Sequence, residues 1–115
     1  MIYSTLLQQA LDNAGNTHEV SDVIEMVAEE RAFMFPLRKS VIVCDLMRCP
    51  NENIWRYWLA AGDLQELRDA EGPITEMAKD RYGIRRSMIF GRPGWRKIFA
   101  PTYKETHRVL LRTLD

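Results

Sequence analysis

The loop at residues 91–95, which reads GRPGW, is the segment of this chain best suited to carry chemistry. Two glycines and a proline bracket Arg92, so the backbone must turn sharply, and Trp95 can anchor that turn to a core. A constrained loop at the end of a strand is a common place for functional side chains. Arg92 and the nearby Arg96 could face an anion or an acidic partner. A rigid turn by itself explains every residue of this loop except Arg92.

Histidine and cysteine, the usual nucleophiles and metal ligands, are few and scattered. His18 and His107 have neither a nucleophile nor a ligand partner at a readable spacing. Cys44 lies in a strand-like run and Cys49 precedes a proline, and no further cysteine or histidine pair completes a metal set. We therefore expect two reduced thiols in a cytosolic compartment and no metal site.

Charge is unevenly distributed along a chain whose formal net charge is zero. Residues 1–83 carry 8 basic and 14 acidic side chains, whereas residues 84–115 carry 8 basic and 2 acidic ones. This asymmetry indicates either an anionic partner at the C-terminal end or an internal match between the two parts. Because the total is zero, a dedicated nucleic-acid-binding protein is not the first expectation.

Aromatic side chains cluster in the run IWRYWLA at residues 54–60. Strand alternation places Ile54, Arg56 and Trp58 on one face and Trp55, Tyr57 and Leu59 on the other. Interleaved with an arginine, the aromatic rings could form a stacking surface for nucleic acid. They could equally be core on both faces of a central strand, or a protein-binding patch if one face is uncovered.

Length and composition predict one soluble domain over residues 1–115. The chain is 46% apolar and 28% charged, which is enough for one hydrophobic core without a metal or disulfide. No apolar run reaches the roughly 20 residues of a membrane span. The N-terminal segment lacks the basic start and long apolar stretch of a signal peptide and reads as a short amphipathic helix.

Periodicity and turn residues predict the order of the elements. Ser4 can cap a first helix that stops at Gly15, and Thr17 or Ser21 can cap a second helix. The following elements are strands at 32–35, 40–47 and 54–60, a helix at 63–82, a strand at 84–90, a helical turn at 96–99 and a last strand at 103–114. Residues 72–73, Gly-Pro, should kink or break the long helix.

The predicted order is α-α-β-β-β-α-β-α-β. A meander followed by a strand–helix–strand unit implies an α/β fold with a mixed central sheet and helices on both faces. Asp63 and Glu66 have the spacing of a capping box, so they mark the start of the long helix.

Several short motifs, in this order and spacing, carry a family resemblance. They are GNTH at 15–18, RAF at 31–33, SVIV at 40–43, WLAAGDL at 58–64, MAK at 77–79, YG at 82–83, GRPGW at 91–95 and RTL at 112–114. Together they resemble the GCN5-related N-acetyltransferase (GNAT) fold without its usual first strand. More closely, the chain is similar to small phage-encoded GNAT-like proteins.

The resemblance implies where a cofactor would bind. A GNAT enzyme holds the pyrophosphate of acetyl-CoA on backbone N–H groups at a Gln/Arg-x-x-Gly-x-Gly/Ala turn, where a helix begins. The equivalent residues here are Ala61, Gly62, Asp63 and Leu64, with Arg92 and Arg96 beside the pantetheine arm. Only one glycine of that pattern is present, and the carboxylate of Asp63 would repel an anion. We therefore expect no cofactor, or acetyl-CoA if the protein is catalytic.

The resemblance also directs attention to acid–base residues, but it assigns no catalytic residue. Tyr103 lies near the region where GNAT enzymes carry a tyrosine acid, although here it begins a predicted strand. Glu52 and Asp45 could serve as bases, and nothing in the sequence singles them out.

The resemblance therefore implies a phage or prophage accessory or virion-assembly protein that acts by protein–protein contacts. Its partners would be phage structural or assembly proteins, and its location the host cytoplasm, with or without retention in the virion. The alternative is an acyl-CoA-dependent N-acetyltransferase with an atypical pyrophosphate loop. A third option is an anion or nucleic-acid contact through the basic C-terminal third.

Overall fold

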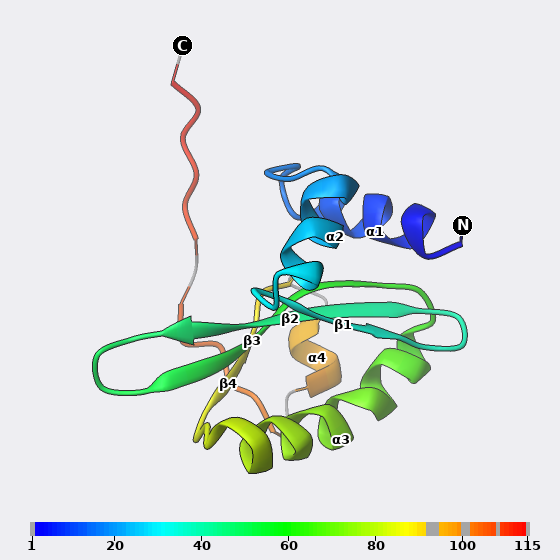
Figure 1. Ribbon diagram of the computed structural model, residues 1–115. Helices are drawn as coiled ribbons and strands as arrows, with labels where there is room; N and C mark the ends of the chain where they lie inside the picture. Colours follow the sequence, from blue (N-terminus) through cyan, green and yellow to red (C-terminus); the bar gives the residue numbers. More distant parts are fainter. Residues whose placement is uncertain (1, 92–94, 100–101, 108, 115) are drawn as a thin grey trace.

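The fold combines a mixed sheet with helices on both of its faces. The computed structural model describes residues 2–91, 95–99, 102–107 and 109–114 (Figure 1). In chain order the elements are α1 (Ile2–Asn13), α2 (Val20–Ala28), β1 (Phe33–Pro36), β2 (Val41–Arg48), β3 (Asn53–Ala61), α3 (Leu64–Tyr82), β4 (Ser87–Ile89) and α4 (Trp95–Phe99). Helices α1 and α2 cover one face and α3 covers the other (Figure 1), which confirms the predicted mixed α/β class.

The sheet has the strand order β1-β2-β3-β4. Strands β1, β2 and β3 form an antiparallel meander, and β4 lies parallel to β3. The hairpin between β1 and β2 closes with the N–H of Leu37 donating to the carbonyl of Ser40 at 2.8 Å. The return from β3 to β4 requires the crossover helix α3, because parallel neighbours cannot be joined by a tight turn.

Two hydrophobic cores lie on opposite sides of the sheet. The core under α1 and α2 consists of Leu7, Ala10, Leu11, Val23, Ala32, Val41, Val43, Leu59 and Ala61. The core over α3 consists of Ile42, Cys44, Trp55, Tyr57, Leu67, Ile74, Ala78 and Ile84. Strand β2 alternates between these cores along its buried half, as strand geometry requires.

Strand β3 does not alternate regularly, and the predicted grouping of Leu59 with Trp55 and Tyr57 is wrong. Val43 pairs with Leu59 but Cys44 pairs with Tyr57, so Trp58 is an extra residue in the ladder. Such a β-bulge shifts the pleat by one residue. Consequently Trp55 and Tyr57 face α3, whereas Leu59 faces α1 and α2.

The helix starts differ in detail from the prediction. Helix α1 already includes Ile2, upstream of Ser4. Helix α2 is capped at Glu19 instead of Thr17 or Ser21, because the carboxylate of Asp22 accepts the N–H of Glu19 at 2.8 Å. The predicted stop at Gly15 is confirmed, since its φ of +90° is the conformation that ends a helix.

Residues 72–73 are predicted to kink or break the long helix; α3 runs as one helix from Leu64 to Tyr82, so a break is wrong. Ile74 and Ala78 follow Pro73 and are buried against the sheet, as Leu67 is before it. This burial on both sides holds the helix axis across a residue that cannot donate an N–H. Gly83, at φ +65°, ends the helix as expected.

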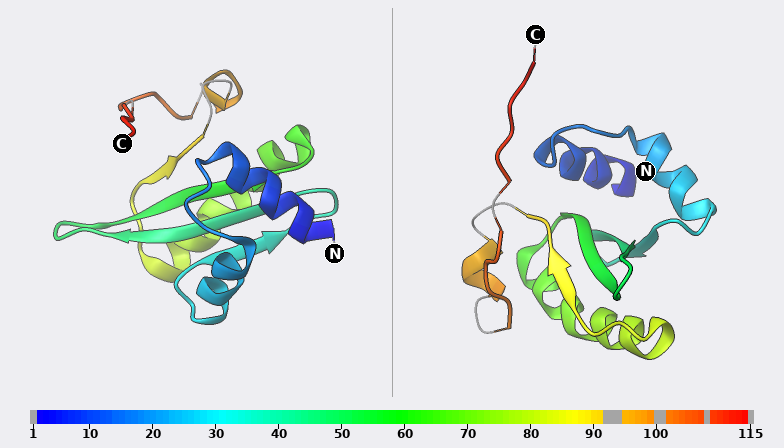
Figure 2. Two further views of the ribbon diagram at one scale, coloured as in Figure 1. Left: turned by 90° about the horizontal axis from the view of Figure 1, so that it is seen from above. Right: turned by 90° about the vertical axis from the view of Figure 1, so that its left-hand side faces the viewer.

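The last predicted strand, residues 103–114, is also wrong for the described residues of that segment. Strand β4 is short, covering only Ser87–Ile89, and none of the described strands pairs with its outer edge. A strand needs a neighbouring edge to satisfy its backbone groups. The C-terminal segment instead extends away from the sheet and helices (red in Figures 1 and 2).

None of the helices described is both long and apolar enough to cross a bilayer.

Candidate functional site

The sheet opens between β3 and β4. Their pairing runs from Trp55 opposite Ser87 to Tyr57 opposite Ile89, and the N–H of Phe90 donates to the carbonyl of Tyr57 at 3.0 Å. Strand β3 continues to Ala61, so the side of residues 58–61 that faces away from β2 has no partner strand among the described residues. This unpaired stretch, residues 58–61, is called the β3 edge below.

A cavity of about 70 Å³ lies at the β3 edge. Its walls include Ala10 and Ala14 from the helical layer on one face and Leu67 and Glu71 from α3 on the other. The cavity therefore reaches both faces of the sheet through the gap that β4 leaves. Its remaining wall is rich in aromatic side chains: Tyr57, Trp58, Phe90, Trp95 and Phe99. An apolar, aromatic concavity with few polar groups is the usual form of a binding site.

A chain of hydroxyl groups converges on Glu71 beside this cavity. The hydroxyl of Tyr103 donates to Oε2 of Glu71 at 2.9 Å, and the hydroxyl of Thr75 donates to the same oxygen at 2.7 Å. Ser87 contacts the hydroxyl of Tyr103 at 2.5 Å, and Tyr57 contacts that of Thr75 at 2.6 Å. Each hydroxyl has one proton, so Ser87 donates to Tyr103. The hydroxyl of Tyr57 lies 3.0 Å from the main-chain carbonyl oxygen of Glu71 and can donate either to that oxygen or to Thr75.

The two phenols of this network remain protonated at neutral pH. Burial, with a smaller contribution from the Glu71 carboxylate, raises the pKa of Tyr103 to about 12. Burial raises the pKa of Tyr57 as well. Tyr103 therefore holds the start of the C-terminal segment against α3 and β4. The sequence indicated Tyr103 only as a residue near the position of a catalytic acid, and Glu71, Thr75 and Ser87 were not predicted.

The predicted pyrophosphate turn directly follows the β3 edge, where β3 ends at Ala61 and α3 begins at Leu64. Ala61 is buried, and the backbone of Gly62 packs so closely on the β1–β2 turn that an added Cβ would lie 2.4 Å from the carbonyl oxygen of Lys39. Asp63 caps α3 by accepting the N–H of Glu66 at 2.9 Å, and its own N–H donates to Oγ of Ser40 at 2.9 Å.

These contacts make the turn a poor fit for a pyrophosphate. The free N–H groups at a helix start are what binds phosphate. Here the carboxylate of Asp63 already takes one of them, and its negative charge lies where the anion would bind. Leu64, the remaining residue of the predicted turn, is exposed.

Of the two arginines of the predicted site, the structure gives a backbone position for Arg96 only. Arg92 lies outside the described residues, so the structure gives no position for it. Arg96 belongs to α4, next to the cavity residue Trp95, and its side chain also lies outside the described part.

The two candidate bases are engaged in ion pairs. Asp45 accepts two hydrogen bonds from Arg56, at 2.8 and 2.5 Å, and Glu52 accepts two from Arg86, both at 2.9 Å. The hydrogen bonds from Arg86 lower the pKa of Glu52. Neither carboxylate lines the cavity, so their geometry indicates structural roles.

Histidines and cysteines form no reactive cluster in the described part of the chain. His18 packs edge-on against Trp58, with ring centroids 4.8 Å apart, and His107 is exposed in the C-terminal segment. Cys44 is buried and Cys49 is exposed, and both are free thiols. No group of three or more potential metal ligands gathers among the described residues.

The aromatic run of β3 forms core more than surface. Trp55 is fully buried and stacks against Phe33 and Tyr82, which also contact each other, and Tyr57 is also buried. Trp58 is half-buried and has the guanidinium of Arg56 5.7 Å from its ring centroid. This confirms the interpretation as core for Trp55 and Tyr57, and leaves no continuous stacking surface among these rings.

Comparisons with models of protein families, with curated proteins and with solved structures found no match. The class that the fold defines is therefore a compact mixed α/β domain, and any function must be argued from its own residues.

Proposed function

We propose that the protein acts by protein–protein contact through its C-terminal segment, as a phage or prophage accessory or virion-assembly protein. One observation carries the first part of this proposal. In the C-terminal segment Val109, Leu110 and Leu111 are 84%, 93% and 90% exposed, and Leu114 is 75% exposed. Contiguous exposed apolar side chains mark a surface that another molecule covers.

The energy available from this segment is sufficient for a specific contact. Full burial of a valine or leucine contributes about 1.5–3 kcal/mol relative to exposure. The four side chains together would contribute roughly 6–12 kcal/mol before the cost of ordering the segment and the partner is subtracted. Tyr103 reduces that cost, because it fixes the root of the segment on α3 and β4.

The phage and virion-assembly part of the proposal is supported by the motifs that resemble small phage-encoded GNAT-like proteins. A GNAT-like topology is supported by the antiparallel meander, the crossover helix α3 and the parallel β3–β4 pair that separates after Tyr57. Phage structural or assembly proteins are the proposed partners, in the host cytoplasm or on the virion.

An acyl-CoA-dependent acyltransferase is the second candidate, because the cavity at the β3 edge could admit a thin, extended ligand. The carboxylate of Asp63 at the start of α3 argues against it. Isothermal calorimetry with acetyl-CoA separates the two candidates. We expect no heat of binding at micromolar concentration, and a saturable signal would favour the enzyme.

The contact proposal is tested by purifying the tagged full-length protein from infected or induced cells. We expect a virion or scaffold protein of the phage to co-purify with it. The double substitution Leu110→Glu with Leu111→Glu should abolish this, because it removes the two most exposed leucines. The control Thr106→Glu with Thr113→Glu adds the same charges to exposed polar positions and should retain the partner. Unchanged recovery with both variants would contradict a role for the apolar side chains.

A further inference from the structure

The proposed function rests on contact between the C-terminal segment and another protein. This inference rests on that contact and adds a second copy of the chain as a partner that would compete with phage proteins for the same segment. We propose that a second copy of this chain provides the cover: the C-terminal segment of one copy docks as an extended strand along the β3 edge of another. The exchange is reciprocal, so two copies form a closed dimer.

The donor is the C-terminal segment, whose sequence predicts a strand but whose described residues pair with none of the strands in the sheet. Residues 102–114 include β-branched and leucine side chains, and their pattern predicted a strand. Thirteen extended residues span roughly 40 Å. The whole molecule measures 36 × 34 × 30 Å along its principal axes, so the segment is long enough to cross to another copy.

The acceptor is the β3 edge, which has no partner strand among the described residues. An extended peptide that adds to such an edge gains main-chain hydrogen bonds, and adjoining pockets take its side chains. The cavity of about 70 Å³ adjoins this edge. A water needs roughly 10–15 Å³ of such volume, so the cavity holds on the order of five waters and has room for an apolar side chain.

Charge favours the same pairing. Residues 2–30 include α1 and α2 and contribute Ala10 and Ala14 to the cavity. They contain six acidic residues and no lysine or arginine. Residues 102–114 contain three basic residues and one acidic residue. The segment of one copy would therefore lie against an acidic helical layer of the other, which favours association.

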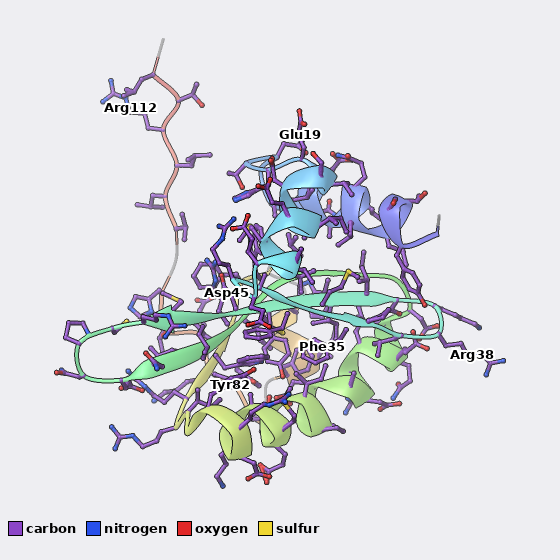
Figure 3. The ribbon with its side chains drawn as sticks, viewed as in Figure 1. Glu19, Phe35, Arg38, Asp45, Tyr82 and Arg112 are labelled. Carbon is purple, nitrogen blue, oxygen red and sulfur yellow. The ribbon has the colours of Figure 1, made fainter. Side chains whose placement is uncertain are left out.

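The segment leaves its own body instead of folding back over it. Tyr103 is tied to Ser87 and Glu71, and beyond this point the chain runs away from the sheet. In Figure 3 Arg112 stands apart from Glu19 and Asp45, and the ribbons of Figures 1 and 2 show the C-terminal segment running away from the sheet and helices. The observed path presents the segment to another molecule.

The test is a complementation experiment with the full-length chain, read by sedimentation at micromolar concentration. We expect the wild type to have twice the monomer mass of 13.4 kDa. A tail variant, Leu110→Glu with Leu111→Glu, and an edge variant, Ala14→Trp, should each lose dimerisation. Ala14 is exposed and lines the cavity, so the indole would block it. Gln9→Trp, on an exposed position of α1 away from the cavity lining, is the matched control and should remain dimeric.

Mixing the two defective variants gives the decisive result. The edge variant retains an intact tail and the tail variant retains an intact edge, so one of the two exchanges is restored and a heterodimer should form. A monomeric wild type, or defective variants that stay apart when mixed, would overturn the second copy as partner. A monomeric wild type that still co-purifies with a virion protein would leave the proposed function standing. Dimerisation of the wild type without co-purification of a virion protein would support the second copy as partner and contradict the proposed virion-assembly function.

Discussion

Replacing Gly62 by alanine separates a structural glycine from a phosphate-binding one. Gly62 has a φ of +124°, a region essentially reserved for glycine, and an added Cβ would lie 2.4 Å from the carbonyl oxygen and 2.5 Å from the Cα of neighbouring backbone. Both obstacles are main-chain atoms of the β1–β2 turn, at Lys39 and Ser40, so they cannot rotate aside. The fold itself therefore requires glycine here.

The expected loss of unfolding free energy has two contributions, which are backbone strain at a positive φ and steric overlap of the added Cβ. Backbone strain of this kind costs about 1–3 kcal/mol, and overpacking against fixed atoms adds about 1–3 kcal/mol. Gly62→Ala should then lower the free energy of unfolding by roughly 2–6 kcal/mol. Gly15→Ala is the matched control, because φ is +90° but nothing lies within 4 Å of the added Cβ. Its cost should be limited to strain, about 1–2 kcal/mol.

The assay is urea denaturation of the wild type and both variants, followed by tryptophan fluorescence. The difference between the two alanine variants isolates the steric term, since both carry the strain of a positive φ. Equal destabilisation of the two variants would refute the close packing of Gly62 on the β1–β2 turn. Unaltered stability of Gly62→Ala would further reopen the interpretation of this residue as a ligand-binding glycine.

Three other predictions concern side chains outside that turn. Tyr103→Phe removes a hydrogen bond to a carboxylate and should cost about 1–2 kcal/mol of unfolding free energy, with faster amide exchange in the following segment; unchanged exchange would contradict its anchoring role. A thiol reagent should titrate only Cys49 in the native protein and both thiols in denaturant, because Cys44 is buried and burial raises its pKa; two fast thiols would refute this. The pKa of Glu52 is lowered by Arg86, so the contribution of their pair is present above the ordinary value of 4.5 and is lost as the pH falls below it. Glu52→Gln should therefore flatten part of the acid-side loss of stability, and an unaltered pH profile would contradict the pair.

Local signals in the sequence predicted most of the elements. Glycines with positive φ ended α1 and α3 where expected, and the spacing of Asp63 and Glu66 marked the start of α3. The capping box itself is only half formed, because the carboxylate of Glu66 accepts the N–H of Lys39 at 2.8 Å instead of returning to Asp63. Turn chemistry acts over a few residues and can be read from the sequence, whereas competition from a distant turn cannot.

The hydroxyl network at Glu71 could not be predicted from the sequence, because its contacts join residues that are far apart in the chain. Tyr103 reaches Glu71 across 32 positions and Ser87 across 16. Such pairings leave no periodic signal, so sequence reasoning missed Glu71 and assigned Tyr103 to a strand. The i, i+4 spacing of Glu71 and Thr75 was the one local hint, and it lies around a Gly-Pro pair that sequence reasoning treated as a break.

The bulge at Trp58 coincides with the opening in the sheet. A bulge bends its strand, increases the local twist and can end the pairing on its edge. The pairing of β4 with β3 stops at Tyr57, the residue immediately before the bulge, and beyond it the side chains of β3 exchange faces. The extra residue places Leu59 in the core under α1 and α2. It also lies next to Tyr57, where the pairing between β3 and β4 ends. Any ligand or chain segment that binds at the β3 edge depends on that single irregularity, so removing Trp58 from the ladder should close the site by extending the β3–β4 pairing.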